Sequence, residues 1–173
     1  MTLHSCVFPT PLGDMLAVAS EHGLCLLEFV GQAGVERELA QVEAAHACLA
    51  QAGDSALLAQ TRSEIAQYFA RQRRDFDVPL DLVGTPFQQR VWQALLQIAF
   101  GQTWSYAQEA AHIGQPTATR AVAAANGANK ISIIVPCHRV IGSNGRLTGY
   151  GGGLARKQAL LALEGAWPQE SLV

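Results

Sequence analysis

Length, composition and charge together describe a globular chain and exclude an integral membrane protein. The sequence has 173 residues, of which 49% are hydrophobic, so it can bury a sizeable core without help from a metal or a disulfide. Its apolar runs fall well short of the roughly 18 to 20 residues that span a bilayer, and no basic region followed by an apolar one begins the chain. We therefore expect a cytoplasmic protein with reduced thiols and no contact with membranes.

Charge is distributed unevenly along the chain. Residues 1–85 carry 5 basic and 11 acidic side chains, a net charge of −6, whereas residues 86–173 carry 7 and 3, a net charge of +4. The second half is the better candidate to meet a polyanion, although so mild a charge is also compatible with chance.

The first half predicts a small α/β domain. Turn residues separate three apolar segments, which are expected to form an antiparallel sheet of strands over residues 3–8, 15–20 and 24–30. Apolar residues then recur at helical spacing and predict two helices, over residues 35–51 and 56–71. Prolines and a glycine interrupt this spacing where the charge changes sign, so we place the domains at residues 1–84 and 85–173.

The second half predicts a mostly α-helical domain that contains a helix-turn-helix. Thr85 as N-cap and Pro86 as first helical residue are suited to begin a helix that runs to about residue 99. Ser105 and Gln108 form a capping-box pattern that begins a short helix ending near residue 114.

Thr117 is expected to cap the second helix of this pair, which runs to about residue 126 and is nearly all alanine. So thin a helix surface can approach another surface closely, as a recognition helix does in a DNA groove. Packing against a neighbouring helix through small residues explains the composition equally well.

An apolar run over residues 131–135 reads as a buried strand that ends at Pro136 and Cys137. A thiol becomes a good nucleophile when it ionises, and the adjacent His138 and Arg139 would favour the thiolate. Neighbours in an extended chain point to opposite sides, so His138 is expected to act through a water molecule or a local turn.

A glycine-rich loop over residues 148–153 opens a predicted helix over residues 154–164 that Gly165 closes. The loop could cradle a phosphate, but it lacks the Lys-Ser or Lys-Thr pair of a nucleotide-binding loop. Glu164 lies at the end of the apolar helix, where the helix dipole disfavours an acid, so we expect it to have a specific partner, most naturally a histidine.

These segments resemble the O6-alkylguanine-DNA alkyltransferase family, most closely its bacterial constitutive form. The resemblance covers the whole second half and, more loosely, the first half through residues 10–13. The motifs that carry it are Arg120-Ala121-Val122, Asn129, Pro136-Cys137-His138-Arg139-Val140 and Gly149-Tyr150-Gly151-Gly152.

The resemblance implies that Cys137 accepts an alkyl group from guanine, with His138 as the base and Glu164 orienting that histidine. Asn129 would hold the turn around the active-site strand, and Tyr106 would stabilise the departing guanine. Such a protein flips the damaged base out of the duplex and acts once, because a thioether has no easy reverse reaction.

The resemblance also implies two binding sets. Arg120 would fill the gap that the flipped nucleotide leaves in the duplex. The remaining DNA contacts would come from Thr119, Ala121 and Ala124, and the guanine pocket from Val140, Tyr150, Gly151, Gly152 and Asn126. The implied partner is double-stranded DNA carrying alkylated guanine, bound by a monomer without cofactor or metal; repair of alkylated thymine remains open.

Two residues depart from the family pattern. Lys130 stands where proline is usual and would add a charge near the DNA side, and Ala123 stands where glycine is common and could crowd a close approach. A zinc site formed by Cys6 and Cys25 with nearby histidines is conceivable, but the spacings match no common pattern, and buried free thiols are the preferred interpretation.

Two other classes of function remain as alternatives. A cysteine hydrolase would use the same nucleophile, base and acid, but it would turn over many times. A DNA-binding module without transfer chemistry would bind damaged DNA and leave Cys137 unmodified.

Overall fold

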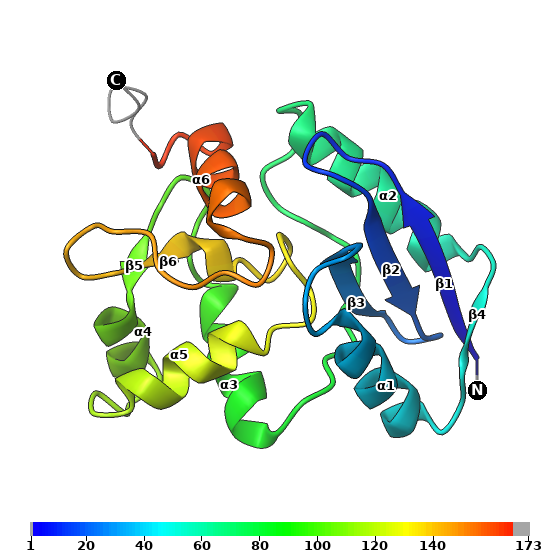
Figure 1. Cartoon of the computed structure of the whole chain (residues 1–173), viewed down its shortest axis with the longest axis horizontal. Helices are drawn as coiled ribbons and strands as arrows, with labels where there is room; N and C mark the ends of the chain where they lie inside the picture. The colour runs from blue at the N-terminus through cyan, green and yellow to red at the C-terminus, as the bar shows by residue number, and fades with distance from the viewer. Residues whose placement is uncertain (1, 168–173) are drawn as a thin grey trace. The chain divides into compact units, whose positions relative to one another are not determined.

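Two units make up the chain, Met1–Val83 and Gly84–Val173, and the computed structural model describes residues 2–167 (Figure 1). The division falls one residue before the boundary placed from the sequence. Among the described residues, no helix has both the length and the apolar character that crossing a bilayer requires.

The first unit is built on a four-stranded sheet with the order β3-β2-β1-β4. Strands β1 (Leu3–Phe8), β2 (Met15–Ala19) and β3 (Leu24–Phe29) form the expected antiparallel meander. Strand β4 (Ala50–Ala52) was not predicted; it pairs in parallel with β1, so the sheet is mixed and extends the expected antiparallel meander by one strand.

Two helices pack on this sheet, α1 (Val35–His46) on β3 and α2 (Ala56–Phe69) on the three meander strands. Helix α1 ends five residues before the predicted end, because Ala47 adopts a left-handed conformation with φ 53° and turns the chain into β4. The N–H of Ala50 then donates to Glu43 Oε2 at 2.8 Å, which fixes the start of the short strand.

The second unit is mostly helical, as expected. Helices α3 (Pro86–Leu95) and α4 (Tyr106–His112) each begin with a capping box, formed by Thr85 with Gln88 and by Ser105 with Gln108. Helix α5 (Thr119–Gly127) packs against both. The remaining elements are the strands β5 (Trp104–Ser105) and β6 (Val140–Ile141), the 3₁₀ helix η1 (Cys137–Arg139) and helix α6 (Leu154–Leu163).

Three local predictions for this unit are wrong. Helix α3 ends at Leu95, before the predicted residue 99. Helix α5 follows Ala118 with no side-chain cap, so Thr117 does not cap it. Residues 131–135 form turns, because Ile133 has φ 72° and the N–H groups of Ile134 and Val135 bond to carbonyls two and four residues earlier.

Candidate functional site

Cys137 is the first residue of η1 and the only partly exposed residue of the described segment 129–140, in which every other residue is buried. Its N–H donates to the carbonyl of Val135 at 2.8 Å, so the thiol stands at the end of a tightly folded turn. This placement offers the sulfur to a ligand while the surrounding backbone is held in the core.

Asn129 crosses this turn and holds both of its ends. Its Nδ2 donates to the carbonyl of Val135 at 2.8 Å and to Cys137 Sγ at 3.2 Å, and its Oδ1 accepts from the N–H of Ile131 at 2.9 Å. A hydrogen bond to sulfur favours the thiolate over the thiol. Asn129 therefore both shapes the turn and acts on the nucleophile.

His138 is fully buried and hydrogen-bonded to the last helix. Its Nε2 lies 2.8 Å from Glu164 Oε2, while its Nδ1 has no hydrogen-bond partner among the described residues. Burial lowers the pKa of His138 despite the opposing effect of Glu164, so the ring is neutral. With Nε2 donating to the carboxylate, Nδ1 carries the lone pair that can take a proton.

Glu164 stays ionised at the centre of a buried network. Burial alone would raise its pKa, but hydrogen bonds from His138 and Arg139 outweigh this and lower the pKa to about 2. Arg139 donates from Nε to Oε1 at 2.8 Å and from Nη2 to Oε2 at 3.0 Å, and its Nη1 donates to the carbonyl of Ile98. The guanidinium of Arg139 thus neutralises Glu164 in the core.

Lys157 is a buried cation whose charge interacts with Cys137, and no role was predicted for it from the sequence. It is fully buried on α6, and its Nζ donates to the carbonyl of Thr148 at 2.6 Å. Burial lowers its pKa to about 8, while the charge of Cys137 acts in the opposite direction. One signal was present in the sequence, because Lys157 lies on the same helical face as Leu160, Leu161 and Glu164.

Tyr106 is brought near the glycine-rich loop by the strand pair. Strands β5 and β6 pair in parallel, with Trp104 opposite Val140, and Tyr106 follows β5 directly. The Tyr106 hydroxyl lies 3.0 Å from Oγ1 of Thr148. The backbone carbonyl of Thr148 accepts a hydrogen bond from Lys157 Nζ. The loop therefore connects the tyrosine to the buried lysine.

The pocket residues implied by the resemblance are unequally placed. Val140 and Gly152 are buried, Tyr150 is half-buried and Gly151 is exposed. Asn126 is buried between α4 and α5, where its Nδ2 donates to Glu109 Oε1 at 2.7 Å.

Helix α5 presents a thin outer face. Arg120, Ala121 and Ala124 are exposed and Thr119 is half-buried, while the opposite side of the helix is buried. Lys130 does not join this face, because it is buried with its Nζ 5.3 Å from the centre of the Trp92 ring. The expectation that Lys130 adds charge to the DNA side is wrong.

A partly exposed thiol, a neutral buried imidazole, an ionised carboxylate bonded to that imidazole and a buried lysine are the parts that can make a cysteine an effective nucleophile. Two family models cover nearly the whole chain: the ribonuclease-like domain of 6-O-methylguanine DNA methyltransferase matches residues 3–82, and its DNA binding domain matches residues 86–166. The chain belongs to the 6-O-methylguanine DNA methyltransferase family, which confirms the resemblance.

Individual relatives agree with this assignment. A methylated-DNA–protein-cysteine methyltransferase of Mycobacterium tuberculosis is 62% identical over 101 residues, 58% of this chain and 61% of the relative. The constitutive enzyme of that name from Bacillus subtilis is 40% identical over 152 residues, 88% of either chain. The alignment with the mycobacterial relative thus spans about three fifths of that protein.

A solved structure matches the whole fold. The crystal structure of M. tuberculosis OGT in complex with DNA is 42% identical and superposes with a TM-score of 0.79 over 97% of either chain. The likeness extends over both units, and it confirms the expected α/β unit followed by a helical one.

Proposed function

We propose that this protein repairs O6-alkylguanine in DNA by moving the alkyl group irreversibly to Cys137. The observation that carries the proposal is the partly exposed Cys137 thiol next to a buried, neutral His138 that Glu164 orients. The names of the relatives, which are methylated-DNA–protein-cysteine methyltransferases, support the same substrate class.

The reaction balances with residues of this chain alone. The Cys137 proton passes to His138 Nδ1 through a water molecule, and the thiolate sulfur forms a bond to the alkyl carbon as the bond from that carbon to guanine O6 breaks. The electron pair of the broken bond leaves with guanine, and the proton that His138 received is passed back through water to the released base, so the ring ends neutral. Because a free guanine anion is a poor leaving group, the Tyr106 hydroxyl donates a hydrogen bond or proton to it. For this, Tyr106 exchanges its present partner, Thr148, for the base.

Double-stranded DNA is the proposed partner of the second unit. The exposed alanine face of α5 is thin enough to approach a groove, and the exposed Arg120 on this face would fill the gap that a flipped nucleotide leaves. M. tuberculosis OGT was crystallised with DNA, and residues 86–166 match a DNA-binding family model. Helices α4 and α5 would then act as the helix-turn-helix, with Thr119, Ala121 and Ala124 facing the backbone of the DNA.

The proposal includes the finer expectations from the sequence: a monomer in the cytoplasm, with alkylated guanine as substrate and a pocket formed by Val140, Tyr150, Gly151, Gly152 and Asn126. Repair of O4-alkylthymine would use the same sulfur.

The number of transfers per molecule separates this function from its rivals. An excess of duplex carrying radiolabelled O6-methylguanine should transfer one equivalent of label to the protein and then stop, and a Cys137→Ala variant should take up none. More than one equivalent of product per protein would support a cysteine hydrolase, and DNA binding without any transfer would support a DNA-binding module.

A further inference from the structure

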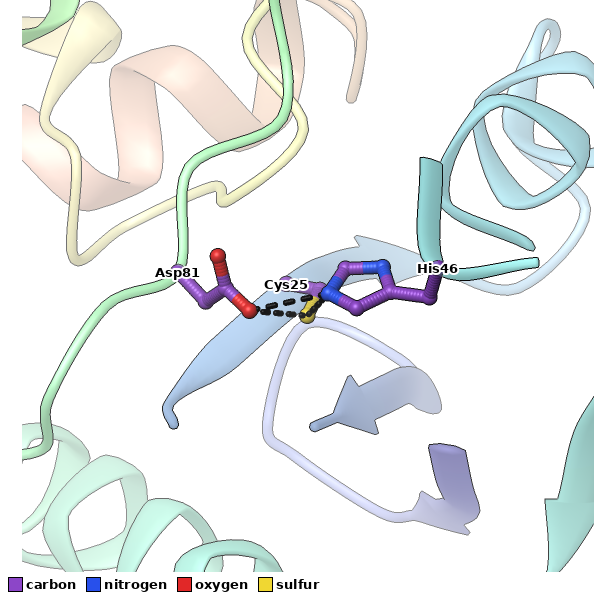
Figure 2. A group of neighbouring side chains, drawn as sticks. All are labelled: Cys25, His46 and Asp81. Atoms are coloured by element: carbon purple, nitrogen blue, oxygen red, sulfur yellow. Dashed lines mark hydrogen bonds and ion pairs between the residues drawn. The ribbon is translucent and has the colours of Figure 1, made fainter. Parts of the chain in front are cut away.

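Three potential metal ligands meet in the first unit, apart from the proposed alkyl-transfer residues. They are Cys25 on β3, His46 at the end of α1 and Asp81 in the segment after α2 (Figure 2). His46 Nε2 lies 2.9 Å from Asp81 Oδ2, Cys25 Sγ lies 3.8 Å from the same oxygen, and sulfur and nitrogen are 4.0 Å apart. Side chains distant in sequence therefore converge on one point.

Backbone bonds hold Asp81 at this point. The N–H of Leu24 donates to the carbonyl of Pro79 at 2.8 Å, and the N–H of Asp81 donates to the carbonyl of Leu24 at 2.9 Å. The segment around Leu80 comes so close to the start of β3 that residue 23 must be glycine, because a Cβ on Gly23 would lie 2.8 Å from the carbonyl carbon of Leu80. The segment thus runs beside β3 in a fixed register.

The cluster is largely shielded from water. Cys25 is fully buried, and the side chains of His46 and Asp81 are 9% and 26% exposed. Of the three side chains, that of Asp81 is the most exposed to solvent.

The orientation of His46 favours a cation in the centre. Its Nδ1 lies 2.9 Å from the carbonyl of Val42, and only an Nδ1–H can satisfy that carbonyl. In the neutral ring Nε2 then carries a lone pair, and this lone pair faces both the Asp81 carboxylate and the Cys25 sulfur. A histidine that binds a metal typically donates its other ring N–H to a backbone carbonyl in this way.

The same geometry argues against a catalytic triad. In a triad the histidine uses one ring nitrogen for the nucleophile and the other for the acid. Here Nε2 of His46 faces both Cys25 and Asp81, and Nδ1 is occupied by Val42. The buried Cys25 would also be closed to a substrate.

The spacing of the three atoms is close to that of a tetrahedral zinc site. Bond lengths of about 2.3 Å to sulfur and about 2.0 to 2.2 Å to nitrogen and oxygen place tetrahedral ligand atoms roughly 3.3 to 3.6 Å apart. The observed separations of 2.9, 3.8 and 4.0 Å lie within a few tenths of an ångström of this range, so small side-chain rotations would complete the site.

We propose that Cys25 Sγ, His46 Nε2 and Asp81 Oδ2 bind one Zn²⁺ ion that ties β3, α1 and the segment after α2 together. The Cys25 proton is released to solvent on binding, so Zn²⁺, thiolate and carboxylate form a neutral buried group. Water fills the fourth position, where Ser20 Oγ, 2.6 Å from Asp81 Oδ2, can hold it. Of the zinc ligands considered from the sequence, Cys25 is kept and Cys6 is not, and the proposed site is structural.

The test measures zinc binding to the full chain in a Cys137→Ser background, which removes the other thiol that adjoins a histidine. Metal-free protein is titrated with Zn²⁺ against a coloured chelator, and thermal unfolding is followed with and without the ion. The expected result is one Zn²⁺ per chain and a higher Tm, with affinity falling about 100-fold or more in Cys25→Ser and His46→Gln. Cys6→Ser, which removes a thiol outside the cluster, should bind like its parent.

A spectroscopic readout keeps the test decisive if a variant fails to fold. Co²⁺ added to the Cys137→Ser protein should give a thiolate-to-cobalt charge-transfer band and the visible spectrum of a tetrahedral ion, and Asp81→Asn should weaken both. Absence of zinc binding, a cobalt spectrum without a thiolate band, or equal loss of affinity in Cys6→Ser would overturn the proposal. In that case His46 and Asp81 form an ordinary ion pair.

Discussion

Nε2 of His138 lies 2.8 Å from Oε2 of Glu164, a buried hydrogen bond between residues 26 positions apart. The bond assigns different tasks to the two nitrogens of the ring, because the one that donates to Glu164 leaves the other as an acceptor. In the proposed reaction, the free Nδ1 of this buried ring serves as the base for Cys137.

Replacing Glu164 by glutamine should slow alkyl transfer at neutral pH by roughly 10²-fold, a typical contribution of general-base catalysis. Without the carboxylate the imidazole is a weaker base, so the apparent pKa of the thiol rises. The loss should shrink as the pH increases and Cys137 ionises unaided. Single-turnover rates between about pH 6 and pH 9 measure this.

Arg139→Gln is the matched control for Glu164→Gln. It also breaks a buried ion pair and should lower stability by a similar amount, but it keeps the hydrogen bond between His138 and Glu164. Thermal unfolding of both variants shows the pH values at which each is folded, and rates are compared only there. A rate loss in folded Glu164→Gln that stays constant up to about pH 9 would show that Glu164 does not act on Cys137.

Lys157→Met should raise the pH at which transfer reaches half its maximal rate by about one unit, which is about a tenfold loss at neutral pH. The cause is the removal of a cation that interacts with the Cys137 charge. Lys157→Arg keeps this charge and should restore most of the rate. An equal loss in both variants, with an unshifted pH profile, would assign Lys157 to loop packing through Thr148 alone.

Arg120→Ala should weaken repair of duplex DNA far more than the reaction with a free alkylated base. An intercalating side chain contributes only when a base must leave a stack. Arg74→Ala removes an exposed arginine from the other unit and should leave both reactions nearly unchanged. If Arg120→Ala slows the reactions with duplex DNA and with the free base equally, Arg120 contributes to folding or to the guanine pocket instead.

Glu109→Gln should stabilise the protein at pH 8 by roughly 3 kcal/mol and change little at pH 5. Burial raises the pKa of Glu109 from 4.5 to about 7, so the folded state binds the proton more tightly than the unfolded state does. Stability is therefore greatest below about pH 4.5 and is lost as the pH rises through 7. Glutamine keeps the shape and can pair with both polar atoms of Asn126.

Urea unfolding at the two pH values measures this difference, and Glu36→Gln on the exposed side of α1 is the control. Glu109 Oε2 and Asn126 Oδ1 have no hydrogen-bond partner within residues 2–167. A protonated Glu109, or the amide of a glutamine at this position, could donate to Asn126 Oδ1 and so satisfy both atoms. A Glu109→Gln effect of the same size at both pH values would refute a titrating Glu109.

Local patterns in the sequence predicted much of this architecture. The meander strands and both capping boxes depend on neighbouring residues, so their positions could be read directly. The histidine partner of Glu164 was also foreseeable, because an acid at a helix C-terminus opposes the helix dipole.

Other features depend on partners far along the chain. Residues 131–135 have the composition of a strand, but Asn129 folds them into turns through bonds to Ile131 and Val135. Lys130 can be buried because its ammonium group lies over the Trp92 ring, and Lys157 can be buried because it donates hydrogen bonds to two loop carbonyls. Strand β4 has three residues, which is too short for any periodicity to show.

Intact mass and peptide mapping after reaction with a duplex that carries one O6-methylguanine give the most direct test of alkyl transfer to Cys137. We expect a gain of one methyl group per chain, located on Cys137 alone, because Cys137 is the cysteine that adjoins the buried imidazole of His138. A methyl group on Cys6, Cys25 or Cys48, or an unchanged mass with the duplex still methylated, would contradict it.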